Sequence, residues 1–85
     1  MNKNYYIVKE EIIFDNTFNE GILLKTENKQ RAERVTERTF KDMLKHPNLI
    51  GCITRQTENK FEAYNTISGD SYKIEIEEYN SEDIE

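Results

Sequence analysis

Residues 29–45, KQRAERVTERTFKDMLK, form the segment that decides the fold. Thr26 and Asn28 precede it, and both residue types are favoured N-caps because their side chains accept hydrogen bonds from the free amides of a first helical turn. Pro47 disfavours helical geometry in the residue before it, so the helix is expected to end before His46. Apolar or small side chains recur every three or four residues, as on one face of a helix. The spacing predicts a helix over residues 29–45 with an apolar stripe of Ala32, Val35, Thr39, Phe40, Met43 and Leu44.

The residues before this helix predict two strands that pair as a hairpin. Residues 4–14 are rich in Tyr, Ile, Val and Phe, which fit a pleated, half-buried surface. The charged triplet at residues 9–11 predicts a bulge or a bend in this strand. Residues 15–21, DNTFNEG, are expected to form a turn-rich link in which Gly21 supplies a positive φ. A short second strand is then expected over residues 22–25.

Three further strands are expected after the helix, over residues 49–56, 61–67 and 71–79. The short turns between them, at residues 57–60 and 68–70, fit an antiparallel meander. The last strand alternates between apolar and polar residues, as a strand with one buried face does. Its inward residues are expected to be Tyr72, Ile74 and Ile76, and those of the strand before it Phe61, Ala63 and Ile67.

The order β-β-α-β-β-β predicts an α+β fold of two layers. One amphipathic helix cannot bury its own stripe, so it is expected to pack on one face of an antiparallel sheet of about five strands. The 85 residues suit one domain over residues 1–85. Residues 80–85 are polar and acidic, and we expect them to fray.

Composition excludes several classes of protein. The chain has no apolar run near the roughly 20 residues that a membrane helix needs. Its N-terminus lacks the apolar segment of a signal peptide, and its one cysteine cannot form an internal disulfide, so a cytoplasmic location is expected. Net charge is −5, but residues 21–60 carry +4 and residues 61–85 carry −7. Asn, Lys, Ile and Glu are abundant and have AT-rich codons, which suggests a low-GC bacterium or its phage.

The first candidate site is a row of cations on the predicted helix. At 100° per residue they share an arc of roughly 80°, directly opposite the apolar stripe. Like charges at this spacing repel, and binding to a partner would relieve that repulsion. The plainer interpretation is a charged helix face that is simply solvated. The predicted partner-binding residues are Arg31, Arg34, Arg38, Lys41 and Lys45.

The second candidate site is the sheet face that the helix leaves open. Tyrosines among carboxylates supply contact area with a polar tip, which suits a protein-binding surface. The plainer interpretation is a solvated face whose negative charge guards the sheet edge. The residues expected there are Glu62, Tyr64, Glu75, Glu77 and Tyr79.

The sequence offers little that could carry catalysis. His46 and Cys52 could form a nucleophile–base pair, but a histidine at a helix C-terminus and a cysteine in an apolar strand usually serve the fold. One Cys and one His cannot make a structural zinc site. The three glycines are too far apart in sequence to form a phosphate-binding loop. We therefore expect no enzyme, no metal and no cofactor.

Two functions remain in view, from different classes. In general character the chain is similar to small phage and mobile-element accessory proteins, many of which, including anti-CRISPR and host-takeover proteins, bind and block a host protein. The first hypothesis is thus a non-catalytic protein-binding module that inhibits a larger, unidentified protein by occlusion. The alternative is nucleic-acid binding through the basic helix face, which the net charge opposes. A homodimer, with the basic helix of one copy against the acidic strands of another, is a further hypothesis.

Overall fold

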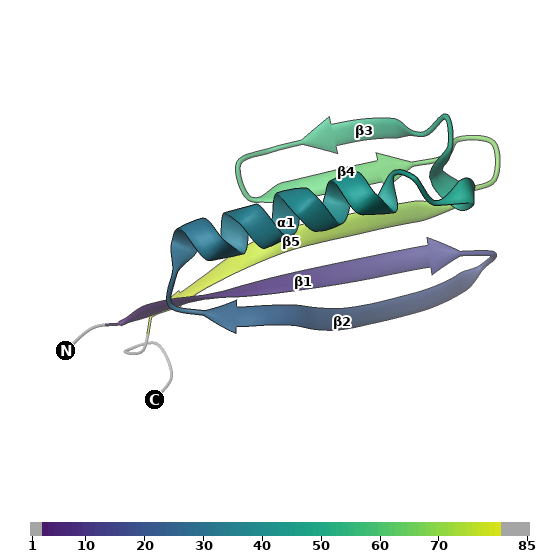
Figure 1. Ribbon diagram of the computed structural model, residues 1–85. Helices are drawn as coiled ribbons and strands as arrows, with labels where there is room; N and C mark the ends of the chain where they lie inside the picture. The colour runs from purple at the N-terminus through teal and green to yellow at the C-terminus, as the bar shows by residue number, and fades with distance from the viewer. Residues whose placement is uncertain (1–2, 81–85) are drawn as a thin grey trace.

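A computed structural model describes residues 3–80 and has the predicted order of elements (Figure 1). Five strands form one sheet, and one helix packs on one of its faces. This confirms the predicted α+β fold. The elements are β1 (Asn4–Phe14), β2 (Thr17–Thr26), α1 (Lys29–Met43), the 3-10 turn η1 (Pro47–Leu49), β3 (Ile53–Gln56), β4 (Lys60–Tyr64) and β5 (Ser71–Asn80).

The sheet has the order β2-β1-β5-β4-β3, and every neighbouring pair is antiparallel. The first and last strands of the chain therefore lie side by side at its centre, with Asn4 opposite Asn80. The predicted meander of β3, β4 and β5 is confirmed. The shorter β3 and the longer β2 form the two edges.

Helix α1 begins where the capping residues predict. The Asn28 side chain accepts the Arg31 amide at 3.0 Å, and the Thr26 hydroxyl oxygen accepts the Asn28 amide at 3.1 Å. Both cap candidates thus take part. The helix ends at Met43 with Leu44 as its C-cap, two residues before the predicted end, so the expectation that Lys45 lies in the helix is wrong.

The link between β1 and β2 differs most from the prediction. Asp15 and Asn16 alone make the turn, both with positive φ (53° and 65°), as in the two-residue turns that match strand twist. Asn and Asp tolerate this conformation better than other non-glycine residues. Strand β2 therefore starts at Thr17, and the predicted link over residues 15–21 is wrong. Gly21 lies within the strand and has no positive φ.

The β1–β2 pairing is irregular next to the charged triplet, but the strand that bulges is β2 and not β1 as predicted. The register shifts between Val8, which faces Leu24, and Lys9, which faces Ile22. Leu23 is therefore the extra residue, and it belongs to the partner strand rather than to β1. A bulge of this kind restarts the alternation of side chains one residue later.

Two segments of the meander are shorter than predicted. Residues 49–52 are not strand, because Leu49 closes the turn η1 and β3 begins at Ile53. Strand β4 ends at Tyr64, so Ile67 lies in the following loop. Its side chain is 96% exposed, and the prediction that it points inward is wrong.

The core lies between α1 and the facing side of the sheet. Phe40 meets Phe61 edge to face, with 5.1 Å between ring centroids, and stacks near Tyr72. Thr36 is buried although it was not in the predicted stripe, and its hydroxyl donates to the Ala32 carbonyl at 2.7 Å. The buried hydrophobic residues are Tyr6, Val8, Ala32, Phe40, Leu49, Ala63, Tyr72 and Ile74.

Asp70 ties together the loops at one end of the sheet. One of its carboxylate oxygens accepts the Asp15 amide and the other accepts the Ser68 hydroxyl, both at 2.9 Å. The Asp70 carbonyl accepts the Asn65 amide at 2.8 Å. The two carboxylate interactions stabilise the ionised form and hold the pKa of Asp70 below its usual range.

Replacing Asp70 with asparagine should therefore destabilise the protein in a pH-dependent way. A carboxylate whose pKa is lowered by folding contributes stability above its unfolded pKa and loses it as pH falls through the folded value. The melting temperature of the wild type should exceed that of Asp70→Asn at pH 7, and the difference should shrink below about pH 4. A difference that stays constant from pH 7 to pH 3 would contradict this role.

Candidate partner-binding surfaces

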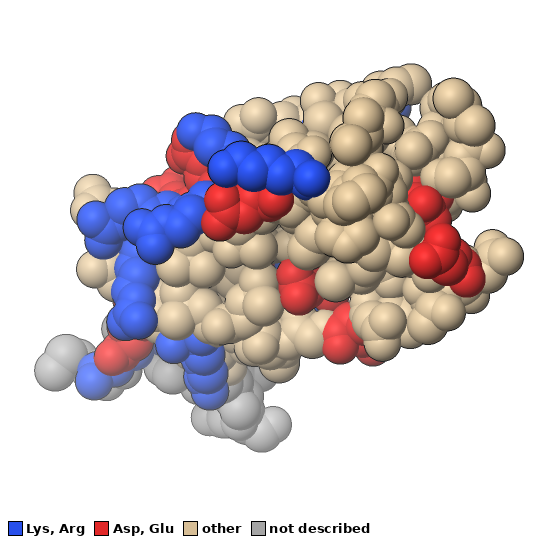
Figure 2. All heavy atoms as spheres, turned by 45° about the vertical axis from the view of Figure 1, so that its right-hand side comes forward, with Lys and Arg blue, Asp and Glu red and all other residues tan. Residues whose placement is uncertain are grey.

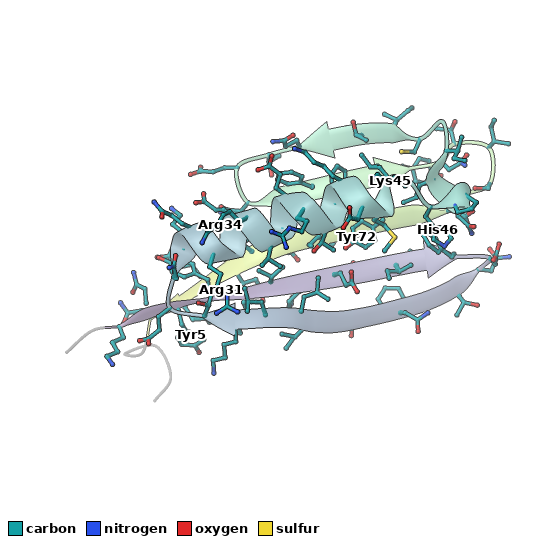
Figure 3. All side chains as sticks on the ribbon, viewed as in Figure 1. Tyr5, Arg31, Arg34, Lys45, His46 and Tyr72 are labelled. Carbon is teal, nitrogen blue, oxygen red and sulfur yellow. The ribbon has the colours of Figure 1, made fainter. Side chains whose placement is uncertain are left out.

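The first candidate surface is the basic face, meaning the five cations predicted on the side of α1 away from the sheet. All five are exposed. Figure 2 shows Lys and Arg side chains gathered over one part of this side of the molecule, and Figure 3 places Arg31 and Arg34 on the N-terminal half of α1 and Lys45 near its other end. Those on the helix are Arg31, Arg34, Arg38 and Lys41, and Lys45 lies in the turn that follows.

Counter-ions divide the basic face into two parts. Lys41 lies 3.0 Å from Glu37 and Lys45 lies 4.0 Å from Asp42, so local carboxylates offset the C-terminal cations. Within residues 3–80, no ion pair forms at the three arginines of the N-terminal part. These are Arg31, Arg34 and Arg38.

The second candidate surface is the open face, meaning the side of the sheet that points away from α1. The five residues proposed for it lie there, because each alternates with a strand neighbour that points toward the helix. They come from two adjacent strands, β4 and β5. They are Glu62, Tyr64, Glu75, Glu77 and Tyr79.

One end of the open face is already held by internal contacts. Tyr79 stacks on Tyr5 with ring centroids 5.4 Å apart, and its hydroxyl donates to Glu77 at 2.8 Å. Lys9 also lies 3.1 Å from Glu77. The Tyr79 hydrogen bond and then Lys9 lower the pKa of Glu77, and the carboxylate in turn raises the pKa of Lys9. Glu77 and Tyr79 are thus engaged with each other.

The open face is close to neutral rather than acidic. Lys73 lies 3.0 Å from Glu11 and Lys60 lies 3.5 Å from Glu62. The compensating lysines come largely from other strands than the carboxylates they meet, so the charge of one segment does not indicate the charge of the face. The strand registers place Lys9, Lys25, Arg55, Lys60 and Lys73 beside Glu11, Glu20, Glu62, Glu75 and Glu77.

A row of apolar side chains crosses the open face, and sequence reasoning missed it. Phe18 faces Ile13 of β1, and Tyr64 of β4 faces Ile53 of β3. Ser71 of β5 lies between Ile13 and Tyr64, so the row takes its apolar residues from four strands and has one small polar residue on the fifth. Exposed fractions range from 38% at Ile13 to 63% at Ile53. A groove of about 490 Å³ adjoins the row over β1, β5, β4 and β3. No local pattern indicates this row, because its residues come from four strands and Phe18 fell within residues 15–21, which were predicted to form a link.

No protein-family model, curated protein or solved structure matches this chain.

His46 and Cys52 make contacts with a turn and with the hydrophobic core. The His46 Nδ1 accepts the Asn48 amide at 3.2 Å and so caps η1, and its ring packs on Phe14 with centroids 4.6 Å apart. Cys52 is half-buried against the core. In residues 3–80, no three His, Cys, Asp or Glu side chains gather as metal ligands do. Over the same residues, no helix has the length and apolar character that crossing a membrane requires.

Proposed function

We propose that the protein is a small, non-catalytic binding module that docks through its open face on a larger protein and inhibits it by occlusion. The observation that carries the proposal is the apolar row formed by Phe18, Ile13, Tyr64 and Ile53. Exposed apolar side chains that gather on one face are typical of protein interaction sites, and only the small Ser71 separates Ile13 from Tyr64 here. Phage and mobile-element accessory proteins are the setting in which such a small inhibitor is expected.

The neighbourhood of the row supports a protein partner over a nucleic acid. Protein interfaces combine an apolar centre with a polar rim, and the paired charges beside the row supply such a rim. A phosphate backbone instead requires unbalanced positive charge, which the open face does not have. The twisted sheet also presents these side chains from hydrogen-bonded strands, so little conformational freedom is lost on binding.

Ile53 and Gln56 offer a matched test of which face is used. Both lie in β3 and are exposed, and they point to opposite faces of the sheet. Tagged protein would be used to capture its partner from a nuclease-treated low-GC bacterial lysate, and the affinity would then be measured with the purified partner. Ile53→Lys should weaken binding at least tenfold, because it places a charge within the apolar row that makes the contact. Gln56→Lys introduces the same charge on the other face and should bind as the wild type does.

A second function, nucleic-acid binding, is favoured by one specific observation. Arg31, Arg34 and Arg38 have no counter-ion within residues 3–80 and could each meet a phosphate. In a parallel capture from lysate without nuclease, material that disappears after nuclease treatment and in the Arg34→Glu, Arg38→Glu double variant would support this function. A protein partner lost in that double variant but kept by Ile53→Lys would instead place the protein contact on the basic face.

A further inference from the structure

Strand β2 is a long open edge of the sheet. It spans ten residues, and within residues 3–80 it pairs only with β1 (Figure 1). Residues 17–23 are exposed on both faces of the sheet. Long edges with exposed apolar residues are templates for pairing with another strand, and proteins commonly shorten or cover them. No strand or helix within residues 3–80 covers the outer side of this edge.

The turn before β2 determines which of its backbone groups face outward. In a hairpin with a two-residue loop, the residues that flank the loop form a hydrogen-bonded pair, and hydrogen-bonded pairs then alternate along the strands. Here that first pair is Phe14 and Thr17. The amide and carbonyl groups of Phe18, Glu20 and Ile22 therefore point away from β1, toward the free edge.

The bulge places an acidic and a basic side chain on the same face of this edge, so that two copies of the edge carry complementary charges. Glu20, Ile22 and Lys25 face Glu11, Lys9 and Ile7, which alternate along β1, so all three side chains of β2 lie on the open face. If these residues paired without the bulge, Lys25 would face Tyr6 and point to the helix side of the sheet. An acidic, an apolar and a basic side chain thus follow one another on one face of the edge.

We propose that a second copy of this chain adds its β2 antiparallel to this edge and so forms a homodimer with one continuous sheet. The two-fold axis passes beside Ile22, which faces its own counterpart. Because the bulge adds Leu23 without adding a position to the pairing, Lys25 lies two positions after Ile22, and Glu20 lies two positions before it. Glu20 of each copy is then opposite Lys25 of the other, which gives two symmetric ion pairs around an apolar centre. Because Ile22 is 65% exposed in the single chain, this contact would remove a large apolar side chain from water.

This arrangement differs from the charge-driven dimer considered from the sequence. That dimer needed an acidic sheet to meet the basic helix, whereas the open face is close to neutral. In the edge-to-edge dimer both helices lie on the same side of the sheet, and the two open faces join on the other. Lys25 stays on the open face, where its Nζ lies over the Tyr5 ring, 4.7 Å from the ring centroid.

A charge swap tests the proposal with purified protein alone. Sedimentation equilibrium over a range of concentrations should show a dimer that dissociates on dilution. Glu20→Lys and Lys25→Glu each place like charges opposite one another and should each weaken the dimer at least fivefold. The double variant restores both ion pairs in reverse and should recover most of the wild-type affinity.

Net charge cannot imitate this result. Glu20→Lys reduces the negative charge of the chain and Lys25→Glu increases it, so general repulsion would move the two variants in opposite directions. All three variants change exposed side chains, and circular dichroism should show them folded.

Three outcomes would overturn the proposal. The first is a wild type that stays monomeric at every concentration. The second is a dimer that neither single variant weakens. The third is a dimer lost in Ile53→Lys but kept in Glu20→Lys, which would place the contact at β3 or on the open face. None of these depends on the capture experiment, so the dimer and the proposed function can fail separately.

Discussion

Replacing Ile74 with alanine is expected to lower the free energy of unfolding by about 2–5 kcal/mol. Ile74 is fully buried at the centre of β5, between Glu10 of β1 and Phe61 of β4. The substitution removes three buried carbon atoms and leaves a cavity that the paired strands on both sides cannot close. Because a domain of this size is stabilised by roughly 4–13 kcal/mol, the loss is a large share of the total.

Ile67 is the matched control for this prediction. The same substitution there removes the same atoms from a loop side chain that is 96% exposed, so stability should change by less than about 0.5 kcal/mol. Urea denaturation of the three proteins gives both values from the shift in midpoint at constant slope. Equal losses for the two variants would show that Ile74 does not occupy the core position described above.

The parts of the fold that sequence predicts well are those with a strong local pattern. The alternation of Tyr72, Ile74 and Ile76 indicated both the strand and its buried face, because a two-residue period is characteristic of a half-buried strand. The stripe around Phe40 did the same for α1, and Asn28 indicated where the helix begins. Each of these signals lies within one element and needs no knowledge of its neighbours.

The parts that sequence predicts poorly depend on pairing between strands. Asp15 and Asn16 form a tight turn whose signal is weaker than Asn-Gly or Asp-Gly. Gly21 resembled a turn residue, although it lies within an edge strand where the absence of a side chain is tolerated. Burial could not identify β2 either, since most of its side chains are exposed on both faces and show no buried alternation.

The same distinction applies to the candidate surfaces. The arc of cations on α1 followed from helical geometry alone, and the structure shows these residues exposed. The neutrality of the open face depends on strand register, which brings Lys73 beside Glu11 and Lys9 beside Glu77 from opposite ends of the chain. The apolar row likewise needs one residue from each of four strands, so no local pattern could reveal it.

Tyr72 and Glu10 form the main polar contact on the helix-facing side of the sheet. The Tyr72 hydroxyl donates to Glu10 at 2.6 Å, and the tyrosine is 1% exposed beneath α1 (Figure 3). Burial and then the adjacent carboxylate both disfavour the phenolate, so they raise the pKa of Tyr72 well above its usual value of about 10. The folded protein therefore holds this proton more tightly than the unfolded chain does.

Alkaline pH should consequently destabilise the wild type more steeply than Tyr72→Phe. A group whose pKa is raised by folding contributes its full stability below the unfolded pKa and loses it as pH rises above that value. At pH 7 the variant should be less stable by about 1–3 kcal/mol, because Glu10 loses its donor. Above pH 10 the wild type alone should lose a further 1.4 kcal/mol or so per pH unit, so the difference should close within about two units.

Urea midpoints measured from pH 8 to pH 12 would show this convergence, with phenolate absorbance as a second signal. Lys9 and Lys73, whose pKa values are raised by their carboxylate partners, also titrate in this range, but they are present in both proteins and cancel in the difference. Tyr64→Phe removes an exposed hydroxyl from the open face and should follow the wild-type curve. If the stabilities of wild type and Tyr72→Phe fell in parallel up to pH 12, folding would not raise the pKa of Tyr72. The buried contact with Glu10 would then be wrong.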